Sequence, residues 1–115
     1  MAVKTKQELA EEVLLELGVA DAADPAGDAV DIGFVLRRYT GVFLEMDDRD
    51  IVFWDENAIP ERVFIPLAKH IAEECKVSFG VEYSGVDENG KTPLMRLQAL
   101  AARGKDAWPV EAEYF

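Results

Sequence analysis

This chain contains few of the side chains that bind metals or form covalent cross-links. Its 115 residues include one cysteine, Cys75, and one histidine, His70. A single cysteine excludes an internal disulfide, and one thiol with one imidazole leaves no cluster with the ligand spacing of a zinc site. The sequence therefore predicts neither a disulfide nor a structural metal.

Long apolar runs are absent as well. No stretch approaches the roughly 18 to 20 apolar residues that a membrane-spanning helix needs. The N-terminal sequence MAVKTKQELAEE becomes charged where a signal peptide would carry its apolar segment. These two absences predict a soluble, cytosolic protein that makes no membrane contact.

Positive charge is scarce. Twelve lysines and arginines stand against 23 aspartates and glutamates, which gives a net charge of −11. This balance argues against general nucleic-acid binding, because such binding depends on basic side chains that neutralise phosphates. A strongly acidic surface either serves solubility or acts beside DNA, as the repelling wall of a channel or as a nucleic-acid mimic.

The feature that the chain does have is a regular helical pattern. Half of its residues are apolar and no long flexible linker divides the chain. This composition predicts one domain with a modest core. Thr5 and Glu8 have the spacing of a capping box, and Gly18 is typical of a left-handed helix end. The first helix is therefore expected to begin at Thr5 and to end near Leu17, before a connection over residues 20–27.

The second helix is expected from about Asp28. Gly33 and Gly41 lie within it and indicate either close helix approach or a bend. The segment from Ile51 to Trp54 that follows is too short to assign between a strand and an irregular turn that fills the core. The apolar residues of this helix recur at helical spacing, namely Ile32, Val35, Leu36, Tyr39, Val42, Phe43 and Met46.

The third helix is expected to start at Pro60 and to run to Phe79. A proline suits a first helical position because its missing N–H would be unbonded there anyway. Pro66 lies inside this helix and is expected to bend it or to shift its true start. Residues 80–91 are predicted to form a loop with a short extended or hairpin element around the turn dipeptide Asn89-Gly90.

A fourth helix completes the pattern. Thr92 caps it, Pro93 takes its first position, and Gly104 is expected to end it. The predicted fold is all-α. It consists of a small bundle of about four helices over residues 1–104 and an extended C-terminal tail over residues 105–115.

One stretch matches a nucleotide-binding motif. Residues 85–92, GVDENGKT, fit the phosphate-loop pattern GxxxxGK[ST], whose backbone N–H groups hold phosphates. A phosphate loop follows a buried strand and requires a later strand ending in aspartate, and only 23 residues follow Thr92. The favoured interpretation is a turn followed by a capped helix, and we expect no cofactor.

No group of residues indicates an enzyme. His70 has no identifiable nucleophile or second acid–base group, and pairing on the helix surface with Glu73 and Glu74 accounts for it. Cys75 lies on the same stripe as Ile71 and is interpreted as a small buried apolar residue. We therefore assign no catalytic, cofactor-binding or metal-binding residue.

Aromatic residues outside the helices are the candidates for contacts with other proteins. Phe53 and Trp54 form an elbow before the third helix and belong either to the core or to the edge of a subunit interface. The C-terminal tail carries a second set, which either covers the chain's own core or enters pockets on a partner. The members of this set are Trp108, Pro109, Val110, Tyr114 and Phe115.

The order of these pieces resembles the head-to-tail adaptor, or connector, family of tailed bacteriophages, typified by the tail accessory factors of short-tailed phages. The resemblance covers most of the chain. It rests on the opening helix KTKQELAEEVLLELGV, the long helix before IVFWDENAIPERVFIPLAKHIA, the loop after FGVEY and the final helix LMRLQALAAR.

The resemblance implies a non-enzymatic virion protein at the head–tail junction, present in the host cytoplasm during assembly. Members of that family form a ring, typically dodecameric, below the portal protein and pass DNA without binding it specifically. The tail residues Trp108, Pro109, Val110, Tyr114 and Phe115 would dock into the portal. The helical body would receive the next tail component, which is a stopper, a tail terminator or a tail hub. The alternative is an acidic regulatory protein or nucleic-acid mimic that binds a host or phage partner.

Overall fold

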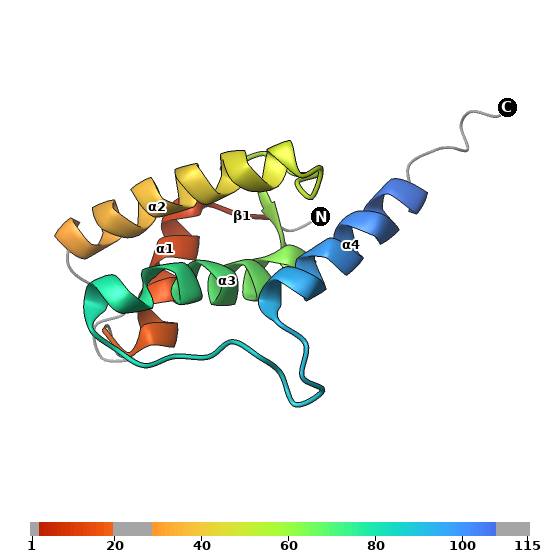
Figure 1. Ribbon diagram of the computed structural model, residues 1–115. Helices are drawn as coiled ribbons and strands as arrows, with labels where there is room; N and C mark the ends of the chain where they lie inside the picture. Colours follow the sequence, from red (N-terminus) through yellow and green to blue (C-terminus); the bar gives the residue numbers. More distant parts are fainter. Residues whose placement is uncertain (1–2, 20–28, 108–115) are drawn as a thin grey trace, which may run out of the picture.

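The computed structural model describes residues 3–19 and 29–107, and four helices make up most of this part (Figure 1). Helix α1 spans Lys6–Leu17, α2 Ala29–Asp48, α3 Glu61–Phe79 and α4 Pro93–Ala107. Helix α3 packs against each of the other three. The predicted all-α bundle of about four helices is therefore confirmed.

Two short strands join the start of the chain to the start of α3. Strand β1, Val3–Lys4, pairs antiparallel with β2, Ile59–Pro60. The sequence predicts Pro60 at the first position of the third helix, but it lies one residue before α3 in an extended conformation. A proline is tolerated in this ladder because both strands are edge strands.

The ends of α1 follow the local signals in the sequence. The Thr5 hydroxyl oxygen accepts a hydrogen bond from the Glu8 amide over 3.1 Å, and the Thr5 amide donates to Glu8 Oε1 over 2.8 Å. Gly18 takes the left-handed conformation with φ 75°, and the next amide, of Val19, donates to the Leu14 carbonyl. The predicted capping box and glycine end are both confirmed.

Helix α2 contains two glycines that do not mark close helix approach. A Cβ atom at Gly41 would meet nothing within 4 Å, and one at Gly33 would meet only the Arg37 side chain, at 3.8 Å. Just after the helix, Asp50 is a non-glycine residue with φ 63°. The segment that follows is irregular, with Ile51 and Trp54 buried, so it takes the core-filling alternative.

Helix α3 runs without interruption through Pro66. Its start at Glu61 is therefore not shifted toward the proline. Pro66 can form no hydrogen bond to the carbonyl four residues earlier, that of Arg62. Its ring is buried against the neighbouring structure, which offsets part of that loss.

Residues 80–91 form an extended loop and not the hairpin that the sequence also allowed. The two short strands that the structure describes lie elsewhere, at residues 3–4 and 59–60. Side chains from the helices satisfy the polar groups of this loop in place of a partner strand. The Tyr83 hydroxyl donates to Glu16 Oε1 over 2.7 Å, and the Gly85 amide donates to Glu73 Oε2 over 2.6 Å. Lys76 Nζ donates to the Tyr83 carbonyl over 3.0 Å. The loop is therefore fixed to α1 and α3.

Helix α4 begins as expected, since the Thr92 hydroxyl accepts a hydrogen bond from the Met95 amide over 3.1 Å. It does not end at Gly104, where the sequence predicts its end, but continues to Ala107. A glycine ends a helix when it takes a left-handed conformation, whereas Gly104 lies within the helix. The predicted boundary between body and tail therefore falls inside a helix.

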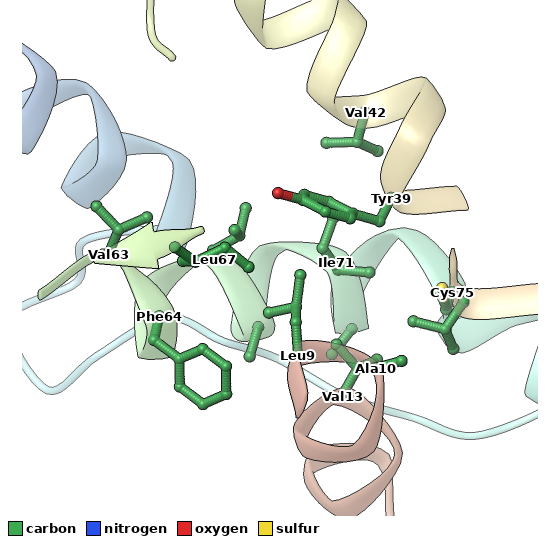
Figure 2. Close-up of a cluster of buried hydrophobic side chains, with 14 of the residues drawn as sticks. Leu9, Ala10, Val13, Tyr39, Val42, Val63, Phe64, Leu67, Ile71 and Cys75 are labelled. Carbon is green, nitrogen blue, oxygen red and sulfur yellow. The ribbon is translucent and has the colours of Figure 1, made fainter. Parts of the chain in front are cut away.

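The core lies between α3 and its neighbours. Figure 2 shows side chains of α1 and α2 converging on α3, with the Tyr39 ring lying over Ile71. Complete burial of one such aliphatic side chain contributes about 1.5 to 3 kcal/mol. The residues at this junction include Leu9, Ala10, Val13, Tyr39, Val42, Leu67, Ile71 and Cys75.

Candidate interaction surface

A hydrogen-bond chain that starts in the core fixes the elbow between α2 and α3. Trp54 Nε1 donates to the Tyr39 hydroxyl oxygen over 3.3 Å, and that hydroxyl donates to the Glu56 carbonyl over 2.9 Å. The Thr40 hydroxyl on the next residue of α2 donates to the Glu56 carboxylate over 2.9 Å. These contacts hold the turn at residues 54–58 against the middle of α2.

Three aromatic rings meet at this elbow in edge-to-face geometry. The centroid of Trp54 lies 5.2 Å from that of Phe53 and 6.2 Å from that of Phe43, with interplanar angles of 89° and 76°. Such pairs contribute about 0.5 to 1.5 kcal/mol beyond the area they bury. The elbow is therefore a rigid aromatic corner.

Beside this corner lies an open pocket of about 930 Å³. Its floor is apolar and half-buried, whereas Asp47 and Asp55 on its rim are exposed. We call it the aromatic pocket. It is lined by Phe43, Asp47, Val52, Phe53, Trp54, Asp55, Ala58 and Pro60.

The structure separates the two elbow residues that the sequence groups together. Trp54 is 8% exposed and belongs to the core of its own chain. Phe53 is half-buried and borders the aromatic pocket, so it remains the candidate for a subunit contact. The tail residues Trp108, Pro109, Val110, Tyr114 and Phe115 lie outside the described residues.

The one cysteine and the one histidine are shielded from solvent to different extents. Cys75 is completely buried, and burial raises the pKa of its thiol to about 11. His70 is half-buried, and burial lowers its pKa against the opposing influence of Glu74, Glu73 and Glu45. The interpretation of Cys75 as a small buried apolar residue is confirmed.

The stretch that matches a phosphate loop is filled by the chain's own carboxylate. Asp87 Oδ1 accepts hydrogen bonds from the amides of Asn89 and Lys91, each over 2.9 Å. The bond from the Lys91 amide is the largest cause of a lowered pKa at Asp87. Gly90 completes the turn with φ 80°. The turn and capped helix of the favoured interpretation are confirmed.

The sequence alone does not predict that the residues of the aromatic pocket lie together. Periodicity assigns Phe43 to the apolar stripe of the second helix, whereas its ring lies at the edge of that stripe and borders the pocket. The acidic residues Asp47 and Asp55 give no signal, because charge at a helix end or turn is usually solvated. The position of Phe43 at the margin of the apolar stripe is the one feature of the sequence that indicates this pocket.

Within residues 3–19 and 29–107, no three histidine, cysteine, aspartate or glutamate side chains gather as a metal site. None of the helices described is both long and apolar enough to cross a membrane. Comparisons with protein-family models, with curated proteins and with solved structures gave no match.

Proposed function

We propose that this chain is a structural head-to-tail adaptor of a tailed bacteriophage. Its copies form a ring under the portal, link the capsid to the tail and continue the DNA channel. The resemblance in the order of the helical pieces motivates this proposal. Three properties of the chain are compatible with it.

The direction of α4 is the observation that carries the proposal. Its last described buried side chain is Ala101, and its C-terminal end projects beyond the other helices (Figure 1). The helix therefore ends at the periphery of the helical body, where a docking arm would begin. The sequence after Ala107 contains the candidate docking residues Trp108, Pro109, Val110, Tyr114 and Phe115.

The aromatic pocket supplies one face of the kind that a ring requires. A closed ring is built from two different patches on each subunit, one of which receives the other. The pocket is open and apolar, and aromatic residues are enriched at the centres of such interfaces. We assign Phe53 and its neighbours to the contact between subunits.

The charge of the chain suits a DNA channel. A net charge of −11 repels the phosphates of DNA that passes through a ring and so keeps it from binding to the wall. Because the same charge also fits a nucleic-acid mimic, charge alone does not separate the two functions. The effect of salt on binding does.

Mixing the purified chain with the portal protein encoded near it tests the proposal. The full chain is expected to form a ring-sized complex, visible by negative-stain microscopy, and a chain ending at Ala107 is expected to form none. A Phe53→Ala variant should bind the portal but form incomplete rings. Binding by neither chain, or a portal-independent interaction that weakens steeply with salt, would favour the acidic regulatory alternative.

A further inference from the structure

A second hollow, of about 330 Å³, lies between α3 and α4. We call it the α3–α4 groove. It runs along one face of α4, whose contributing residues recur at intervals of four. It is lined by Arg62, Pro66, Lys91, Met95, Arg96, Ala99, Leu100 and Arg103.

The charge of this groove is opposite to that of the chain as a whole. Four of the twelve basic residues line it, and no acidic residue does among the side chains that the structure describes. Among the described side chains, none of these four forms an ion pair within 4.0 Å. The nearby Asp87 accepts hydrogen bonds from two backbone amides, and the charges of Arg96 and Lys91 help to lower its pKa. One carboxylate offsets part of the charge of four basic side chains, so the groove keeps net positive charge within the described part of the chain.

The floor of the groove is apolar. Pro66 is buried, Leu100 is half-buried, and Met95 is 48% exposed although it is a large apolar side chain. A methionine beside arginines suits an occupant that carries both carboxylates and large apolar groups. A bare phosphate backbone would use the arginines and leave this floor uncovered.

We propose that the α3–α4 groove binds the C-terminal segment of the same chain, Trp108 to Phe115. This segment, WPVEAEYF, alternates large apolar side chains with Glu111 and Glu113. Its negative charge is complementary to the basic groove, whereas the acidic rim of the aromatic pocket would repel it. The segment should therefore bind in the groove and not in the aromatic pocket.

The segment is long enough to return along α4. Eight extended residues span about 26 to 29 Å. The 15 residues of α4 span about 22 Å. A tether this short gives an effective concentration in the millimolar range, so the contact within one chain prevails over the same contact between chains at micromolar concentration. Binding in the groove does not depend on the portal-docking role.

Titration of a labelled WPVEAEYF peptide into a chain ending at Ala107, followed by fluorescence anisotropy, tests this contact without portal protein. Saturable binding is expected. It should weaken with salt, and by about tenfold or more in an Arg96→Glu, Arg103→Glu double variant, since the acidic side chains introduced there repel Glu111 and Glu113 of the peptide. The matched control is Arg37→Glu on α2, which should leave binding unchanged. Circular dichroism melts confirm that each variant folds.

Three outcomes would overturn the proposal. The first is absence of peptide binding up to millimolar concentration, or binding that ignores the arginine variants. The second is tighter binding of a short DNA duplex than of the peptide, which would make the groove a phosphate site. The third is self-association of the full chain that truncation at Ala107 abolishes, which would make a second copy the occupant. The portal and the groove would compete for the same segment, so portal binding is measured in a separate assay and its failure is distinguishable from failure of this contact.

Discussion

Trp54 and Tyr39 form the hydrogen bond that positions the elbow between α2 and α3. The indole Nε1 donates to the phenol oxygen over 3.3 Å, and the phenol donates onward to the Glu56 carbonyl over 2.9 Å. Both partners are buried. The Tyr39 hydroxyl therefore links the rim of the aromatic pocket to α2, beside the bond from the Thr40 hydroxyl to the Glu56 carboxylate.

Replacement of Tyr39 by phenylalanine is expected to destabilise the protein by about 1 to 3 kcal/mol, because the Trp54 N–H and the Glu56 carbonyl each lose a buried partner. Urea unfolding followed by tryptophan fluorescence measures the loss as a lower midpoint. An unchanged midpoint would mean that the hydroxyl group does not anchor the elbow.

Alkaline pH is expected to destabilise the fold. Burial raises the pKa of Cys75 to about 11 and that of Tyr39 to about 12. A group whose pKa is higher in the folded state contributes stability below its unfolded pKa and loses it as the pH rises through the folded value. The free energy of unfolding should therefore fall between pH 9 and pH 12, from the ordinary thiol pKa to the Tyr39 value.

Urea titrations at several pH values measure this decline. A Cys75→Ala variant should start less stable, because it leaves a cavity, but should lose less between pH 9 and pH 10. A stability that is constant up to pH 11 would contradict the burial of both groups.

Acid is expected to act through His70. Burial lowers its pKa from 6.5, so it contributes stability above 6.5 that is lost as the pH falls through the folded value. Glu73 and Glu74 on α3 and Glu45 on α2 oppose the shift, whereas Arg49 adds to it. A His70→Gln variant should show a smaller loss of unfolding free energy between pH 7 and pH 5 than the parent. An identical loss would assign the acid sensitivity to other groups.

Two glycines are expected to respond in opposite directions to alanine. A Cβ atom at Gly85 would lie 2.7 Å from Pro93 Cγ and 3.2 Å from Lys69 Cβ. Gly85→Ala should therefore cost about 1 to 3 kcal/mol. A Cβ atom at Gly41, inside α2, would have no neighbour within 4 Å, so Gly41→Ala should stabilise by about 0.5 to 1 kcal/mol. Thermal melts of both variants check the pair, and equal effects would contradict the packing described for the loop.

Local signals predict most helix ends. The capping box of Thr5 and Glu8 and the glycine after Leu17 act over a few residues, so the sequence displays them directly. The end of α2 is less visible, since Asp50 takes a left-handed conformation that glycine usually provides. At Gly104 the sequence predicts a helix end that the structure does not have. A glycine interrupts a helix only weakly when its backbone stays helical.

The surfaces are less predictable than the helices, because they depend on contacts distant in sequence. The loop at residues 80–91 is fixed by Tyr83 and Glu16, which are 67 residues apart. The aromatic pocket joins Phe43 with the segment after α2, and the α3–α4 groove joins Arg62 with Arg103. Helical periodicity shows which residues share a face, but not which helix covers that face.

The molar mass of the complex between the portal and this chain, measured by light scattering, tests the adaptor function most directly. We expect the full chain to add one ring of subunits to the portal and the chain ending at Ala107 to add none. A portal mass that neither chain changes would contradict the proposed function.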